Sequence, residues 1–99
     1  MRVISRATLR DFWLDPQNQD SEQPLKAWYD EAKCAAWKSP HDIKSLYRNA
    51  SFVGNNRVIF NIHGNKYRLV VSVNYTFSII YIRFVGSHAE YDKIDAATV

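Results

Sequence analysis

Three residues near the carboxyl end of the sequence carry side chains that can transfer protons. His88, Tyr91 and Asp92 fall within five positions, directly after an apolar run that shrinks to Gly86 and Ser87. If a helix begins there, His88 lies three positions before Tyr91 and four before Asp92, so the three share a helix face. An imidazole transfers protons near neutral pH and a carboxylate can orient it. The spacing therefore makes acid–base chemistry plausible, although spacing alone favours Asp92 as a simple favourable charge near a helix start.

Positive charge collects in the second half of the chain. There is no acidic residue between Asp42 and Glu90, and the cations in this interval are Lys44, Arg48, Arg57, Lys66, Arg68 and Arg83. Arginines without acidic partners repel one another unless water or an anionic ligand surrounds them. The formal net charge of +3 is too mild to decide between these two states. The interval favours a phosphate-bearing partner, with plain solvation as the alternative.

The strands that carry these cations follow from alternating β-branched and aromatic residues. We predict three strands, near Arg57 to His63, Lys66 to Tyr75 and Ser78 to Ser87. Two-residue turns at Gly64-Asn65 and Thr76-Phe77 then set the register. The apolar pairs that result are Ile62 with Tyr67, Phe60 with Leu69, Val58 with Val71, Val73 with Ile80, Val71 with Ile82, and Leu69 with Phe84. One sheet face is thus predicted to pack under helices.

The opposite sheet face is predicted to be open, cationic and free of carboxylates. Its members are Arg57, Asn61, His63, Lys66, Arg68, Ser72, Asn74, Tyr81, Arg83 and Ser87. In this register Arg68 lies beside Asn61 and Val85. Arg83 is one diagonal step from Arg68, at ~7 to 8 Å between backbones. We expect these two guanidiniums to grip one phosphate, with His88 projecting from the rim toward the same anion.

Helical periodicity in the first half supplies the covering layer. "RVIS" is a short strand, and Ser5 caps a helix that buries Leu9, Phe12 and Trp13 and stops near Asp15-Pro16. A polar link leads to a longer helix whose apolar face contains Leu25, Trp28, Tyr29, Ala32, Ala35 and Ala36. "SPHDIKSLY" is a helical turn capped by Ser39. We predict an α+β fold: a short N-terminal strand, two helices, a three-stranded antiparallel meander packed on the helices, and a short C-terminal helix.

Composition fits a single domain over residues 1–99, because 46% of the residues are hydrophobic and 14% are aromatic. Cys34 is the lone cysteine, which excludes an intrachain disulfide, and we expect it to be a small buried filler. No apolar run fits a signal peptide or a membrane span, which favours a soluble cytoplasmic protein without a membrane partner. His41, His63 and His88 lack chelating spacing, so we expect neither a metal nor a cofactor.

Two stretches resemble a known family. "FNIHGNKYRLVVSV" followed by "IYIRFVGSHAEYDKID" is similar to the HigB toxin family, a branch of the RelE-like toxins of bacterial toxin–antitoxin systems. The similarity covers roughly the whole chain in order and length, and it is most specific over Phe60 to Asp95. Ser87 stands where the family more often has threonine, a change that keeps the hydroxyl.

The resemblance implies a RelE-like fold and an mRNA interferase, which is an endoribonuclease that cleaves mRNA without a metal and so stops translation. Many relatives act on mRNA in the ribosomal A site. Carried over to this chain, the catalytic residues are Arg68, His88 and Tyr91, with Asp92 adjoining. The cationic face adds the expected substrate-binding residues Arg57, Lys66, Arg83 and Ser87. The implied neutralising partner is a HigA antitoxin, a helix-turn-helix DNA-binding protein.

Two other classes of function remain open. A non-catalytic basic module that blocks translation by binding RNA or the ribosome needs the same cations but is indifferent to His88. A protein-interaction subunit would use its aromatic surface only toward a partner. New mRNA ends after expression would exclude a pure binder, and a growth phenotype without the partner would exclude the interaction subunit.

Overall fold

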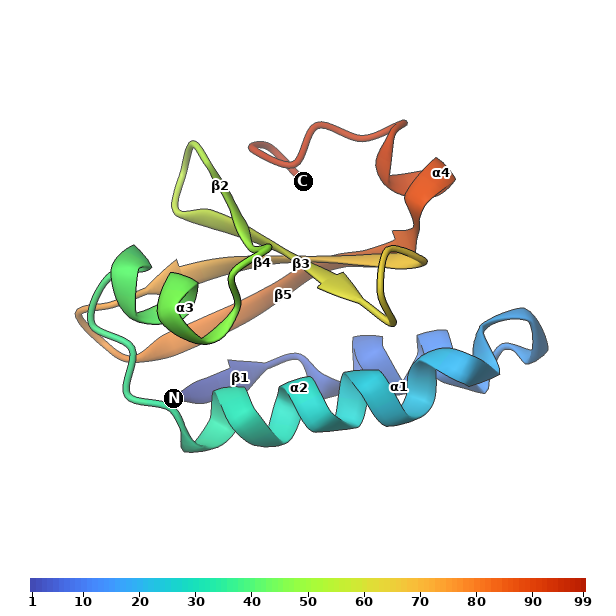
Figure 1. Ribbon diagram of the computed structural model, residues 1–99, viewed down its shortest axis with the longest axis horizontal. Coiled ribbons are helices and arrows are strands. Elements are labelled where there is room, and N and C mark those ends of the chain that lie inside the picture. Colours follow the sequence, from blue (N-terminus) through green and yellow to red (C-terminus); the bar gives the residue numbers. More distant parts are fainter.

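The computed structural model describes all 99 residues, Met1–Val99, and arranges them in three layers. The elements are β1 (Arg2–Ile4), α1 (Arg6–Leu14), the 3₁₀ helix η1 (Pro16–Ser21), α2 (Glu22–Cys34), α3 (Pro40–Leu46), β2 (Ser51–Val53), β3 (Arg57–Ile62), β4 (Tyr67–Asn74), β5 (Ile79–Ser87) and α4 (His88–Tyr91). Figure 1 shows α1 and α2 on one side of the sheet, and α4 with the C-terminal segment on the other. No helix has the length and apolar character needed to cross a membrane.

One mixed sheet of five strands forms the middle layer, in the order β1-β5-β4-β3-β2. The predicted meander β3–β4–β5 is confirmed, and each of its strands lies within one residue of the predicted bounds. The predicted N-terminal strand pairs in parallel with β5. Strand β2, which pairs with β3, was not predicted. Its three residues are all exposed, so no buried side chain gives the alternation by which strands are recognised.

The predicted register holds across β3 and β4 and fails in the second half of β5. Ile62 pairs with Tyr67 and Val73 with Ile80, as both turns require. However, Val71 pairs with Ile82 while Val70 pairs with Phe84, so a β-bulge leaves Arg83 without a partner.

The bulge makes two predicted pairings wrong. Leu69 faces Val85 rather than Phe84, and Arg68 faces Gly86 rather than Val85. Because side chains alternate along a strand, the extra residue turns Phe84 away from the helices. Phe84 consequently belongs to the opposite side of the sheet.

The main core lies between the sheet and the first helices. Leu9 and Trp13 of α1 are buried, and the buried residues of α2 are Leu25, Trp28 and Ala32. They pack on alternate residues of β3 and β4, namely Val58, Phe60, Ile62, Tyr67, Leu69, Val71 and Val73. The predicted polar link is in fact the 3₁₀ helix η1, in which the Asp15 carboxylate accepts a hydrogen bond from the Gln17 N–H at 3.0 Å.

Helix α2 ends earlier than its apolar pattern indicates. Ala35 is already extended, with φ −75° and ψ 158°, so Ala36 lies beyond the helix and is exposed. Cys34 is the last helical residue and its side chain is exposed, so the prediction of a buried filler is wrong. Trp37 takes the next core position instead and is 5% exposed.

A second, smaller core covers the far face, by which we mean the sheet face opposite α1 and α2. Ile59, Val70 and Ala96 are buried there, and the side chains that pack on them are Phe84, Tyr91, Ile94 and Val99. The prediction of an open far face is therefore wrong at its centre. Ile59 and Val70 alternate with the cations of β3 and β4, and this apolar strip requires a cover. The C-terminal segment supplies this cover. The polar side chains of the far face therefore lie around its edge, which we call the rim.

Candidate active site

Helix α4 begins where the sequence predicts, and a capping box fixes its first residue. The Ser87 hydroxyl accepts a hydrogen bond from the Glu90 N–H at 3.1 Å, and the Glu90 carboxylate accepts one from the Ser87 N–H at 2.9 Å. Such a cap contributes about 1 kcal/mol to helix stability. The His88 N–H also donates to the Lys66 carbonyl at 3.2 Å. His88 is thus held beside the β3–β4 hairpin, at the end of β5.

His88, the first residue of α4, and Asp92, the residue directly after this helix, form an exposed pair. The imidazole Nδ1 lies 3.1 Å from the Asp92 Oδ2, and the two side chains are 54% and 58% exposed. Of the two roles that the sequence leaves open for Asp92, the structure shows the contact that orients the imidazole. A carboxylate at Nδ1 favours a proton on that nitrogen. The Nε2 atom is then the one available to a substrate.

Arg68 lies at the same end of the sheet, because its strand partner Gly86 is two residues before His88. Its side chain is half-buried, and Nη1 donates to the carbonyls of Asn65 at 3.0 Å and Tyr67 at 3.3 Å. No carboxylate pairs with it. Since a guanidinium carries five N–H donors, most of them remain free for an anion.

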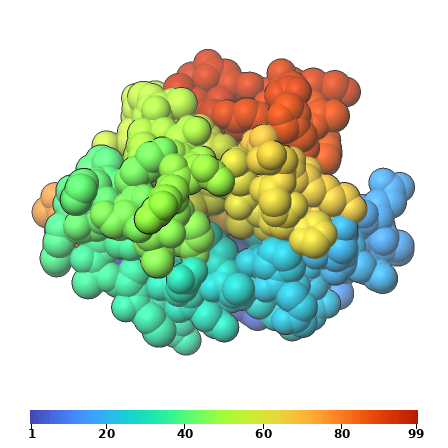
Figure 2. All heavy atoms as spheres, viewed as in Figure 1, coloured from blue at the N-terminus to red at the C-terminus, as the bar shows by residue number.

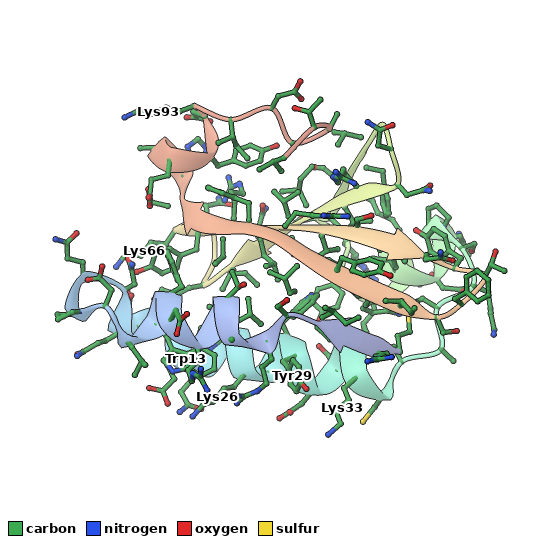
Figure 3. All side chains as sticks on the ribbon, turned by 180° about the vertical axis from the view of Figure 1, so that it is seen from behind. Trp13, Lys26, Tyr29, Lys33, Lys66 and Lys93 are labelled. Atoms are coloured by element: carbon green, nitrogen blue, oxygen red, sulfur yellow. The ribbon has the colours of Figure 1, made fainter.

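The ammonium group of Lys66 does not lie on an open face as predicted, because it contacts Asp20 of η1. The Asp20 carboxylate also accepts a hydrogen bond from the Tyr67 hydroxyl and lies 3.7 Å from Nε2 of His63. The hydrogen bonds from Lys66 and Tyr67 lower the pKa of Asp20, and the Asp20 contact raises the pKa of Lys66. Figure 3 shows Lys66 between α4 and the segment that follows α1.

The bulge moves Arg83 one residue further from Arg68 along β5, so the predicted diagonal pairing of these two arginines is wrong. The partner of Arg68, Gly86, lies three residues beyond Arg83, or ~10 Å along the strand. Phe84, the residue after Arg83 in β5, packs on the second core. Arg83 is exposed, and its guanidinium carbon lies 5.5 Å from the centroid of the Tyr81 ring.

The remaining predicted site residues make contacts within the protein. Arg57 donates to the carbonyls of Asn55 at 3.2 Å and Val99 at 2.8 Å, which ties the C-terminal segment to the sheet. Ser87 caps α4. The Tyr91 ring is half-buried against the second core, and its hydroxyl makes no hydrogen bond within the protein.

Sequence reasoning missed Asp20 and the two clefts in the surface. Asp20 lies 46 residues before Lys66, in a segment without periodicity, so no local pattern indicates the contact. One cleft, of about 280 Å³, adjoins the β3–β4 hairpin, and the other, of about 230 Å³, lies beside β2. Neither is lined by Arg68 or His88. The candidate site is therefore a shallow rim rather than a pocket.

Comparison with known families gives a match over most of the chain. A family described as HigB_toxin, RelE-like toxic component of a toxin-antitoxin system, matches residues 21–94. The matched part contains the meander and α4, and with them Arg68, His88, Tyr91 and Asp92. A search of curated proteins found no significant match.

Proposed function

This chain belongs to the HigB family of RelE-like toxic components of toxin–antitoxin systems, and on that premise we propose that it is an endoribonuclease that cleaves mRNA. An antitoxin partner follows from the family. The observation that supports catalysis is the exposed His88–Asp92 pair, whose members lie 3.1 Å apart. It stands at the same sheet end as Arg68, a cation with no internal carboxylate partner.

Cleavage without a metal requires three events at the scissile phosphate. The ribose 2′-oxygen loses a proton and attacks phosphorus, the crowded phosphorane is stabilised, and the departing 5′-oxygen gains a proton. Arg68 binds the phosphate and holds it more tightly as negative charge grows in the transition state. His88 transfers one proton through Nε2, while Asp92 orients the ring through Nδ1. The Tyr91 hydroxyl serves the other proton transfer.

The other cations act outside this centre. Lys66 binds a backbone phosphate when it leaves Asp20, and exposed Arg83, stacked on Tyr81, contacts a phosphate further along the strand. Arg57 and Ser87 contribute through the contacts they already make, by holding the C-terminal segment and α4 in place.

Expression in cells with mapping of mRNA 5′ ends tests the proposal. The wild-type chain should arrest growth and produce new 5′ ends, while His88→Ala and Arg68→Ala at matched expression should produce neither. Growth arrest without new ends would instead identify a binder that blocks translation. Unchanged cleavage in both variants would contradict the assignment of the centre.

The partners are tested with purified components. We propose that the ribosome presents the mRNA and that a HigA-type helix-turn-helix protein neutralises the toxin, as the family membership supports. Incubation with naked mRNA and, separately, with programmed ribosomes should show cleavage mainly in the second case. Equal cleavage of naked mRNA would remove the ribosome from the proposal.

A further inference from the structure

We propose that the cleft beside the β3–β4 hairpin binds a nucleobase of the RNA, next to the phosphate held by Arg68. The inference rests on the proposed function and adds a base subsite to it. The cleft has a volume of about 280 Å³, and its lining includes Tyr47, Arg48, Asn49, Phe60, Asn61 and Gly64. In Figure 2 the green α3 and the connection after it adjoin the yellow hairpin on the front of the molecule.

One wall of the cleft is a fixed turn between α3 and β2. The Ala50 N–H donates to the Tyr47 carbonyl at 3.1 Å, which places Arg48 and Asn49 at the two central positions. Lys44 donates to the Ala50 carbonyl at 2.7 Å and holds the turn from the α3 side. The turn therefore presents Arg48 and Asn49 in one arrangement, although both side chains are exposed.

Beside this turn the cleft reaches the outer edge of β3, which is open there because β2 stops short. Pairing between β2 and β3 ends at Ile59, so the outer edge of β3 from Phe60 onward has no neighbouring strand. The Tyr47 ring lies edge-on to the buried Phe60 ring, with centroids 5.0 Å apart. The Tyr47 hydroxyl is held by Glu31. Because Phe60 is only 1% exposed, the apolar surface open to a flat ring comes from half-buried Tyr47 and from Leu46, which also lines the cleft.

Most hydrogen-bonding groups of Arg48, Asn49 and Asn61 have no partner within the protein. Arg48 makes no ion pair and Asn49 makes no side-chain hydrogen bond, while Asn61 uses only its amide nitrogen, toward Asn65 Oδ1 at 3.3 Å. None of the lining residues is acidic. Amide side chains match the donor and acceptor edges of bases, and a guanidinium plane stacks on an unstacked base. The cleft is thus equipped for a base of single-stranded RNA.

The cleft adjoins the phosphate site through the hairpin. Asn61 pairs directly with Arg68, which puts their backbones ~5 Å apart. Asn65 joins them further, because its carbonyl accepts from Arg68 at 3.0 Å and its side chain accepts from Asn61. A phosphate on Arg68 and a base in the cleft would then belong to the same short stretch of RNA.

Binding of fluorescent homopolymers tests the subsite without cleavage. Oligoribonucleotides of A, C, G and U are titrated against the His88→Ala protein, which we expect to prefer one of them. Arg48→Ala and Asn49→Ala in that background should reduce the preference by about 10-fold. Matched exposed controls are Arg2→Ala and Gln23→Ala, which lie outside the cleft and should keep the preference. Melting curves verify that each variant is folded.

Equal affinity of the His88→Ala protein for all four homopolymers would overturn the proposed base subsite. A base preference that is unchanged in both cleft variants would also overturn it. Weaker antitoxin binding with unchanged base preference would also overturn it and assign the cleft to the protein partner. Cut-site mapping separates this failure from failure of the proposed function. Cleavage with the wild-type base pattern in Asn49→Ala contradicts the cleft alone, whereas absence of cleavage by the wild type contradicts the ribonuclease.

Discussion

In the proposed centre, Asp92 leaves Nε2 as the nitrogen of His88 that a substrate can reach, because its carboxylate lies 3.1 Å from Nδ1. We predict that His88→Ala lowers the cleavage rate ~10²- to 10⁴-fold, which is about 3 to 5 kcal/mol in the activation barrier. The melting temperature should stay close to wild type, since the side chain is exposed. Single-turnover cleavage of a defined mRNA, with a thermal melt of the same sample, measures both.

Tyr91 allows chemistry and packing to be separated. Its ring packs on the second core, while its hydroxyl has no partner in the protein. We predict that Tyr91→Phe lowers the cleavage rate and leaves the free energy of unfolding within about 0.5 kcal/mol of wild type. Tyr91→Ala should lower both, because it also leaves a cavity. Cleavage by Tyr91→Phe at the wild-type rate would restrict Tyr91 to a packing role.

Helix η1 is fastened to the β3–β4 hairpin through Asp20, and this contact depends on pH. The Lys66 and Tyr67 hydrogen bonds lower the pKa of Asp20 below its unfolded value. The stabilisation is therefore complete above about pH 4 and is lost as the pH falls through the lowered pKa of the folded state. We predict that Asp20→Asn melts below wild type at pH 7, and that the gap narrows at pH values under 4. Thermal melts across this range test it, and a constant gap would contradict the contact.

Gly86 allows α4 to fold down onto the sheet. A Cβ at this position would lie 2.6 Å from Phe84 Cζ and 3.2 Å from the Cβ of Glu90. We predict that Gly86→Ala costs about 1 to 3 kcal/mol of folding stability and also slows cleavage, because α4 carries His88. Gly54→Ala is the matched control, since its added Cβ meets nothing within 4 Å. Urea unfolding and cleavage rates are measured for both variants. Equal stability of Gly86→Ala and Gly54→Ala would contradict the prediction.

The elements differ in how far the sequence predicts them. The register between β3 and β4 follows from apolar alternation on both sides of Gly64, since a slip would expose Phe60 and Leu69. The bulge at Arg83 has no comparable signal, because Phe84 and Val85 are both apolar and either suits a core. What distinguishes them is the C-terminal segment, whose Ala96 clusters with Val70 on the far face. Phe84 packs on this cluster, and Val85 therefore faces the helices.

The site shows the same division between local and long-range information. The four-residue spacing between His88 and Asp92 predicts their contact, because i and i+4 side chains are neighbours on a helix. The Asp20–Lys66 contact joins segments 46 residues apart and depends on how η1 docks, which no spacing encodes. In the site, the contact between side chains four residues apart could thus be predicted, and the contact between segments 46 residues apart could not.

On the scale of the whole molecule, the two cores cover the two faces of the sheet. The main core occupies the helix side of the sheet, and the second core occupies the centre of the far face. Arg48 lies beside the hairpin, Arg68 close to its turn and Arg83 on the bulge, and none of them has an ion pair. An RNA strand that meets all three must follow the rim.

This arrangement predicts the salt dependence of RNA binding. Neutralising about three phosphates of a single strand gives a slope near −2 in log affinity against log salt, so affinity should fall about 20-fold between 50 and 200 mM salt. Arg68→Ala should reduce the slope by roughly 0.7, the share of one phosphate. Arg2→Ala, an exposed charge on β1 at the opposite edge of the sheet from the hairpin, should leave it unchanged. Fluorescence anisotropy on the His88→Ala background, titrated at four salt concentrations, measures the slopes. Equal slopes for Arg68→Ala and Arg2→Ala would mean that RNA does not contact Arg68, and the proposed path along the rim would have to be abandoned.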